Sequence, residues 1–349
     1  MSTDKKDIRK LNIEELEEYI SSIGEKSFRA RQIYEWLWKK NAHSFDDMTN
    51  LSKGFRAKLS EVFSIQNIKV DLIQKSDDGT IKNAVKLFDG NIVESVLIPT
   101  NSRTTACVSC QVGCSLNCEF CATAKLKRMR NLTAAEIVDQ VAVIDRESRE
   151  FFDRPLSNIV YMGMGEPMMN YNEVVKSIRM ITSPEGLGMS PKRITVSTSG
   201  IPKMVKMLAD EELRVKLAVS LHSAREEIRN RIMPFSTKFP LNDLLESLQY
   251  WYDKTKSRIT FEYLIWKNIN DTQADIDALV KYAKKVPSKI NLIEYNPIDD
   301  GEFEQADPGV IEAYTEALEK NGIVVKVRRS RGKDIDAACG QLANKSFEE

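Results

Sequence analysis

Five of the six cysteines in this chain lie between residues 107 and 121. Three of them, Cys114, Cys118 and Cys121, form a CxxxCxxC triplet in which eight residues carry three thiols. Cysteine thiolates are soft ligands that select zinc or an iron–sulfur cluster over hard cations. The triplet therefore predicts a soft metal centre held by these three residues.

The spacing favours a 4Fe-4S cluster over structural zinc. A structural zinc site uses four closed ligands, usually in two separated pairs, and this sequence has no remote second pair. Cys107 or Cys110 could still supply a local fourth ligand, so structural zinc stays open as an alternative. Three ligands on a 4Fe-4S cluster leave one iron open, which is the coordination position that a catalytic metal needs.

Composition and charge narrow the class of protein. The 349 residues contain 42% apolar side chains, which predicts a packed globular protein of about two domains. The sequence contains only two histidines, His43 and His222, so mixed His/Cys zinc sites and histidine-dependent catalytic triads are disfavoured. No apolar run approaches the ~20 residues that span a bilayer. We expect a cytoplasmic protein with reduced thiols and no membrane contact.

Net charge is zero, since 51 Lys and Arg balance 51 Asp and Glu, but the charge is uneven along the chain. A basic run at 125–130 follows the cysteine triplet, and a second at 326–333 precedes Cys339. Basic residues on both sides of one site suit a polyanion whose phosphates must be positioned. The alternative for each run is a solvated basic surface.

From about residue 104, short β-branched runs alternate with helical patterns, which predicts βαβ units and a parallel sheet. In a closed or partly closed barrel, functional residues lie on the loops after the strand ends. The expected strands are 104–109, 158–162, 194–197, 215–221, 259–265, 290–294 and 323–327.

The first hundred residues differ from the rest. Helical spacing of apolar residues at 13–23 and 28–40 predicts short helices, and Asp89-Gly90 between two apolar runs predicts a hairpin. We expect a helical accessory domain at 1–80, a hairpin or linker at 81–103, and the α/β barrel with a C-terminal cysteine segment at 104–343. Thr133–Glu136 and Ser223–Glu226 both fit a capping box at a helix start.

At this point the chain resembles the radical S-adenosylmethionine (SAM) enzymes, which carry CxxxCxxC with an aromatic residue, here Phe120, before the last cysteine. The resemblance implies a partial (β/α)6 TIM-like barrel, with the cysteine loop following its first strand. It also implies that the open iron binds SAM, whose reductive cleavage yields a 5′-deoxyadenosyl radical.

Several further motifs resemble the branch that methylates C2 of adenine in 23S ribosomal RNA and tRNA. They are Cys107-Val-Ser-x-Gln-Val-Gly-Cys114, Met162-Gly-Met-Gly-Glu-Pro167, Ser197-Thr-Ser-Gly200, Ser220-Leu-His222, Tyr295-Asn-Pro297 and Asp334-Ile-Asp-Ala-Ala-Cys-Gly-Gln-Leu342. Cys110 departs from the family pattern, where serine is expected, and could act as a stray ligand or an oxidation site.

The resemblance implies a route through Cys339. One SAM methylates this thiol, the radical from a second SAM removes hydrogen from the S-methyl group, and the methylene radical adds to C2. A base, for which Glu94 is the family match, removes the C2 proton. Cys107 then attacks the Cys339 sulfur, which releases the product and leaves a disulfide bond. Taken without the resemblance, Cys339 reads as a small buried residue, Cys107 as a strand residue or fourth metal ligand, and Glu94 as a strand carboxylate.

By the same resemblance, the cofactor SAM is bound by residues at strand ends: Gly165, Glu166, Ser197, Ser220, Leu221, His222 and Asn296. The implied partners are 23S rRNA, tRNA and an electron donor such as flavodoxin, with the enzyme acting as a monomer. Two other functions remain open: an adenine-C8 RNA methyltransferase and, from a different class, a zinc-stabilised RNA-binding protein.

Overall fold

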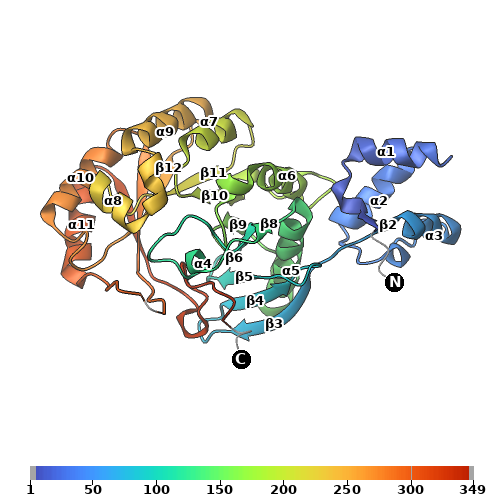
Figure 1. Cartoon of the computed structure of the whole chain (residues 1–349), viewed down its shortest axis with the longest axis horizontal. Coiled ribbons are helices and arrows are strands. Elements are labelled where there is room, and N and C mark those ends of the chain that lie inside the picture. The colour runs from blue at the N-terminus through green and yellow to red at the C-terminus, as the bar shows by residue number, and fades with distance from the viewer. Residues whose placement is uncertain (1–4, 300, 346–349) are drawn as a thin grey trace.

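A ten-stranded mixed sheet forms the centre of the computed structural model, which describes residues 5–299 and 301–345 (Figure 1). The strand order is β14-β13-β12-β11-β10-β9-β6-β5-β4-β3. These strands are β3 (Lys69–Lys75), β4 (Ile81–Lys86), β5 (Ile92–Pro99), β6 (Thr104–Cys107), β9 (Asn158–Tyr161), β10 (Ile194–Thr198), β11 (Lys216–Ser220), β12 (Ile259–Leu264), β13 (Ser288–Ile293) and β14 (Val324–Arg328).

Strand β6 and the six strands β9 to β14 are all parallel to one another, which confirms the seven strands expected from the β-branched runs. Each of the first six is followed by helix before the next begins, so six βα units precede β14. Central strands are buried on both faces; every residue of β12 is buried. The helices are α4 (Ala122–Lys125), α5 (Ala134–Phe152), α6 (Tyr171–Thr182), α7 (Pro202–Asp210), α8 (Glu226–Ile232), α9 (Leu241–Thr255), α10 (Gln273–Ala283) and α11 (Pro308–Lys320).

The predicted hairpin around Asp89-Gly90 is present as β4 and β5, which pair antiparallel from Lys86 opposite Ile92. Gly90 takes a φ of 85°, a conformation that glycine adopts without strain. β5 then pairs antiparallel with β6, so the hairpin extends the barrel sheet. β3 extends it by one more strand; residues 69–75, which we expected in the helical unit, therefore lie in the main sheet.

A separate helical unit precedes β3 and lies at one end of the molecule (Figure 1). Its helices pack through Leu16, Ile20, Ile33, Leu37 and Leu59, each at most 4% exposed. Its elements are β1 (Lys6–Asp7), α1 (Ile13–Ser22), α2 (Phe28–Trp38), α3 (Lys53–Val62) and β2 (Phe63–Ser64), with β1 parallel to β2.

One of the two predicted capping boxes is present. Thr133 caps α5, and Glu136 returns a bond to the Thr133 backbone. The box at Ser223 was wrong, because α8 begins only at Glu226. The Ser223 hydroxyl instead accepts from the Arg225 N–H, and the Glu226 carboxylate accepts from the Leu241 N–H, so neither is available to cap α8.

Within the described part of the chain, no helix has the length and apolar character needed to cross a membrane.

Candidate active site

The cysteine triplet lies on the loop between β7 (Gln111–Val112) and α4. Gly113 starts this loop with a φ of 72°, and a Cβ there would lie 2.5 Å from the Lys127 carbonyl oxygen. The loop is therefore folded back closely on the segment before β8 (Arg130–Asn131), which pairs with β7. This arrangement holds Cys114, Cys118 and Cys121 on a single loop beside the barrel.

The three thiols interact electrostatically with one another, as expected for ligands of one centre. Burial raises the pKa of Cys114 to about 11 and also raises the pKa values of Cys118 and Cys121. Backbone N–H groups point at the sulfurs of Cys114 and Cys121; they come from residues 115, 116, 123 and 124. Such donors stabilise thiolates, so the loop fits a thiolate-bound cluster.

Among residues 5–299 and 301–345, no three Cys, His, Asp or Glu side chains converge as ligands of a single metal ion. A four-iron cluster is wider than one ion, so its cysteine ligands stand further apart. The donor set fits such a cluster through three soft sulfurs on one loop and the N–H groups that face them.

The segment after β9 packs directly on the segment after β6. A Cβ at Gly163 would lie 2.6 Å from the Ser109 hydroxyl, and one at Gly165 would lie 2.5 Å from the Gln111 Cβ. Gly165 also takes a φ of 95°, which disfavours any side chain. The glycines of the Met162–Pro167 motif therefore bring its backbone against the start of the cysteine loop.

Glu166 ends this motif with its carboxylate in the barrel mouth, where it is 3% exposed. Its oxygens accept from the backbone N–H groups of Met168 at 3.0 Å and Ser199 at 2.8 Å. Burial raises the pKa of Glu166, and these hydrogen bonds oppose that effect. Each carboxylate oxygen can accept a further bond, so Glu166 can still bind a ligand donor.

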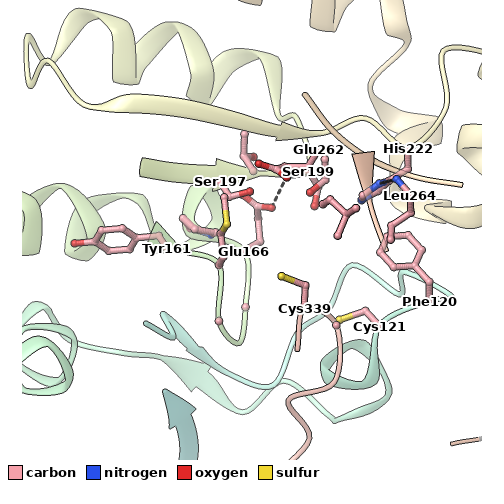
Figure 2. Close-up of a pocket in the computed structure, with 18 of the residues that line it drawn as sticks. Phe120, Cys121, Tyr161, Glu166, Ser197, Ser199, His222, Glu262, Leu264 and Cys339 are labelled. Atoms are coloured by element: carbon pink, nitrogen blue, oxygen red, sulfur yellow. Dashed lines mark hydrogen bonds between the residues drawn. The ribbon is translucent and has the colours of Figure 1, made fainter. Parts of the chain in front are cut away.

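A cavity opens at the carboxyl ends of the parallel strands (Figure 2). Of the predicted SAM-binding residues, five line it, namely Gly165, Glu166, Ser197, Ser220 and His222. Cys121 and Cys339 line it as well, so a cluster ligand and the second thiol segment meet there. Leu221 and Asn296 are not among its lining residues; Leu221 is fully buried behind the cavity wall.

His222 is held as a neutral imidazole. Burial lowers its pKa to about 3, and the charge of Arg229 lowers it further. Its Nδ1 accepts from the Leu264 N–H at 3.2 Å, which leaves the proton on Nε2. The ring packs edge-on against Phe120 with centroids 4.8 Å apart (Figure 2). His222 can therefore donate one hydrogen bond at the cavity wall.

Cys107 and Cys339, which lie far apart in the sequence, both line a second cavity. Cys339 lines both cavities and is exposed, whereas Cys107 is buried. Burial raises the pKa of Cys107 to about 12, and a charge on Cys339 would raise it further. The structure holds both as free thiols and shows no disulfide bond between them.

Four arginines line the second cavity together with the two thiols. They are Arg103, Arg328, Arg329 and Arg331. Arg328 also lines the first cavity, where it forms an ion pair with Glu262 at 3.5 Å. Glu262 was not among the site residues predicted from the sequence. The one feature that could have indicated it is its position as an acidic residue inside the mainly apolar strand β12. The second cavity thus combines thiols with cations suited to phosphate.

Asn296 lies beside the Cys339 segment. Its Nδ2 donates to the Cys339 carbonyl at 3.2 Å, while its buried Oδ1 has no hydrogen-bond partner among the residues described. The side chain therefore fixes the Cys339 backbone and offers one free acceptor.

Glu94 lies in β5 with its side chain fully buried, and it lines neither of the two cavities. Its Oε2 accepts from the N–H groups of Ala343 at 2.8 Å and Asn344 at 3.1 Å. Its Oε1 lies 3.3 Å from the Lys82 ammonium but has no hydrogen bond. Glu94 therefore anchors the chain that follows Cys339.

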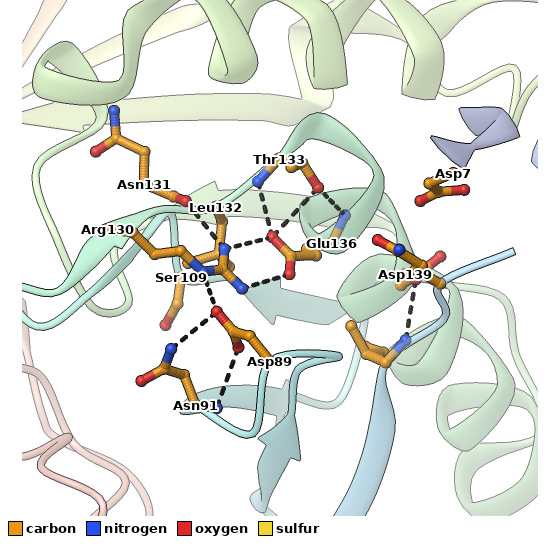
Figure 3. A network of polar contacts seen from close by, with 12 residues as sticks. Asp7, Asp89, Asn91, Ser109, Arg130, Asn131, Leu132, Thr133, Glu136 and Asp139 are labelled. Carbon is orange, nitrogen blue, oxygen red and sulfur yellow. Dashed lines mark hydrogen bonds and ion pairs between the residues drawn. The ribbon is translucent and has the colours of Figure 1, made fainter. Parts of the chain in front are cut away.

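The first basic run is partly structural. Arg130 forms a bidentate pair with Glu136 at the start of α5 and bonds Asp89 of the hairpin turn at 2.5 Å (Figure 3). Burial raises the pKa of Asp89, but bonds from Arg130 and Asn91 outweigh it and bring the value to about 2. Lys127 and Arg128 remain exposed beside the cysteine loop, so they carry the positive surface of this run.

Two family models match the chain. Residues 108–283, which contain the cysteine loop and the glutamate motif, match the radical SAM superfamily, and residues 6–65 match the ribosomal RNA large subunit methyltransferase N-terminal domain. The fold and the site thus define a radical SAM enzyme.

Relatives identify the branch. A probable dual-specificity RNA methyltransferase RlmN of Flavobacterium psychrophilum is 68% identical over 99% of this chain and 100% of its own. The dual-specificity RNA methyltransferase RlmN of Geotalea uraniireducens is 43% identical over 97% of each chain. A crystal structure of a radical SAM methyltransferase from Sphaerobacter thermophilus has a TM-score of 0.91 at 39% identity, covering 97% of this chain and 99% of that one. The chain belongs to the RlmN family of radical SAM RNA methyltransferases.

Proposed function

We propose that this enzyme methylates C2 of an adenine in 23S ribosomal RNA and in tRNA, with Cys339 as the methyl carrier and Cys107 as the resolving thiol. The observation that carries the proposal is the shared cavity in which both thiols meet four arginines. Adenine C2–H is neither acidic nor nucleophilic, so a polar methyl transfer has no reasonable path, whereas a carbon radical can add there.

The cofactors in this proposal are one 4Fe-4S cluster on Cys114, Cys118 and Cys121 and two SAM molecules per turnover. When bound, the cluster and SAM supply the carbon radical that removes a hydrogen atom from the S-methyl group. Gly165 and Glu166 provide close backbone approach and a carboxylate for the SAM ammonium. The remaining ligands that we propose are Ser197, Ser220, Leu221, His222 and Asn296.

Cys339 acts first as nucleophile toward the methyl group of SAM, which requires its thiolate. Although residue Cys339 is exposed, the surrounding cavity wall desolvates its thiol and raises its pKa; the Arg328 charge opposes this and favours the thiolate. After addition to C2, the ring radical would return one electron to the oxidised cluster and lose the C2 proton to a base, which restores the aromatic ring. The Cys107 thiolate then attacks the Cys339 sulfur; the S–S bond forms as the C–S bond breaks, and the released carbon takes a proton.

We propose Glu94 as the group that takes the C2 proton. The Oε1 atom, which has no hydrogen bond, can accept a proton, while Oε2 holds Ala343 and Asn344. Glu94→Gln separates the two roles, because an amide oxygen still accepts these N–H groups but the side chain no longer takes the proton. If Glu94 is the base, this variant should accumulate the RNA–Cys339 adduct. Normal turnover by the variant would show that Glu94 only anchors the chain.

For the domains, we propose that the helical accessory unit ends before β3, so that residues 69–103 belong with the barrel. The accessory unit and the exposed basic residues would contact RNA. We further propose that the enzyme works as a monomer in the cytoplasm and takes its electron from a donor such as flavodoxin.

The test of the proposal is a trapped adduct. Cys107→Ala, incubated anaerobically with SAM, reductant and RNA, should accumulate an RNA–protein cross-link through Cys339, since no thiol releases the product. Cys110→Ser is the matched control: its thiol is buried nearby with one weak contact to the Met164 carbonyl, and the variant should turn over without a cross-link. Normal turnover by Cys107→Ala would contradict the assignment.

A further inference from the structure

Arg229, in α8, carries a buried charge that forms no ion pair within the described chain, although the charge of Glu226 acts on it from more than ion-pair distance. The side chain is fully buried, and its Nη2 donates to the Ser199 carbonyl at 2.6 Å. Its Nε and Nη1 are also buried and have no hydrogen-bond partner in the described chain. Burying a guanidinium without a paired charge is costly, so this residue needs an anionic neighbour.

The position of Arg229 indicates which neighbour that is. The last residue of α8, Ile232, accepts a backbone bond from Glu119 in the cysteine loop at 3.1 Å. The adjoining Cys118 and Phe120 pack against the apolar cluster to which Ile232 belongs. Arg229 therefore stands in the wall that α8 forms beside the cysteine loop.

On its other side, the guanidinium reaches the end of β10. Ser199, whose carbonyl it holds, also donates its N–H to Glu166. A Cβ at Gly200 would lie 3.5 Å from Nη2, so the guanidinium lies close under this turn. Arg229 thus lies between the cysteine loop and the strand end that supports Glu166.

Its field reaches the groups of the site. The Arg229 charge disfavours protonation of His222, whose low pKa is mainly due to burial. His222 packs on Phe120 of the cysteine loop, so the guanidinium acts on the wall that this loop shares with the first cavity.

We propose that Arg229 is a positioning residue that stabilises the negative charge of the thiolate-bound cluster and raises its reduction potential. The inference rests on the proposed cluster on Cys114, Cys118 and Cys121. Reduction adds one negative charge to the cluster, and a fixed buried cation favours the reduced form. Arginine suits this role because it stays protonated where a lysine can lose its proton.

The alternative is that Arg229 only braces the wall between α8 and the β10 end. Two variants separate the roles. Arg229→Gln keeps an N–H for the Ser199 carbonyl but removes the charge, and Arg229→Lys keeps a charge in altered geometry. Arg225→Gln is the matched control, since Arg225 precedes the same helix but is only partly buried and is paired with Glu227 and Asp275.

The experiment is an anaerobic redox titration of the reconstituted full-length enzyme, monitored by EPR, without RNA or SAM. Arg229→Gln should hold the same iron as wild type but bind the electron at least tenfold more weakly, which lowers the midpoint by about 59 mV. Arg229→Lys should lie nearer wild type, and Arg225→Gln should be unchanged.

An unchanged midpoint in Arg229→Gln would overturn the proposal. Loss of the cluster from both Arg229 variants would also overturn it, because the role would then be to brace the loop. Failure of the proposed function would be distinguishable from this. If wild-type enzyme holds iron but leaves RNA unmethylated, the proposed reaction is refuted, and the midpoint potentials of wild type and Arg229→Gln can still be compared.

Discussion

A buried ion pair between Arg9 and Asp139 joins the helical unit to the barrel, and breaking it should destabilise their junction. Arg9 Nη1 lies 2.8 Å from both carboxylate oxygens of Asp139 in α5. Arg9 also donates to the Gln66 carbonyl and to the Asn67 side chain, in the link between β2 and β3. Asp7 and Asp139 face one another near this junction in Figure 3. The pair therefore holds both the unit and its link against α5.

The magnitude follows from burial. Arg9 is 3% exposed and Asp139 is 4% exposed, so Arg9→Met leaves a buried carboxylate with only the Ile68 N–H at 3.3 Å. Breaking one partner of such a pair costs about 3–5 kcal/mol. Replacing both, as in Arg9→Met with Asp139→Leu, should recover only part of that loss, because the buried Asp7 carboxylate, 3.4 Å from Arg9 Nε, then stays unpaired.

Urea unfolding followed by circular dichroism, together with limited proteolysis at the link, measures the effect. Arg31→Met is the control, because the Arg31 side chain is 79% exposed and its pair with Glu17 should contribute at most about 1 kcal/mol. Arg9→Met should be cleaved faster between the unit and β3. Equal stability of Arg9→Met and Arg31→Met would refute the reasoning.

Three further predictions concern the site and its support. Gly165→Ala should weaken SAM binding at least tenfold by calorimetry, because its φ of 95° and close neighbours leave no room for a Cβ; Gly54→Ala, in open space, should not, and equal binding by the two variants would refute this reading. The Asp89 pKa is lowered to about 2, but Asp89 is exposed and solvent screens its pair with Arg130, so the pair should contribute at most about 1 kcal/mol, complete only above about pH 5. It should be lost as pH falls toward 2, and Asp89→Asn should unfold without this dependence; parallel curves would count against it. With a pKa of about 12, Cys107 should react with iodoacetamide about tenfold faster for each pH unit between 7 and 10, as followed by peptide mass spectrometry; a flat profile would contradict its burial as a thiol.

Much of the barrel could be predicted because its signals are local. The buried positions of β9, β10 and β11 are mainly apolar and mostly β-branched, which marks these strands in the sequence. The Thr133 capping box needs only its own four residues. β3 was not predicted, since its exposed residues lack an apolar pattern and its pairing with β4 is set by the sheet.

The site divides in the same way. The metal-ligand role of Cys114, Cys118 and Cys121 can be predicted from their spacing, but the residues that surround them in the fold cannot. The contact of Glu94 with Ala343 joins residues that only the folded chain brings together, and the orphaned guanidinium of Arg229 is visible only once burial is known. Arg130 looked like a free cation in the sequence, yet its charge is taken up by Glu136 and Asp89.

Nucleoside mass spectrometry tests the central claim most directly. RNA treated with the reconstituted enzyme, reductant and methyl-labelled SAM is digested, and the methylated adenosine is compared with 2-methyl and 8-methyl standards. We predict 2-methyladenosine carrying the labelled carbon, with Cys339→Ala giving none. Labelled 8-methyladenosine would mean the C8 reaction, and no methylated adenosine from iron-loaded enzyme would contradict the account. Unchanged RNA binding by a zinc-containing Cys339→Ala protein would point instead to a binding protein.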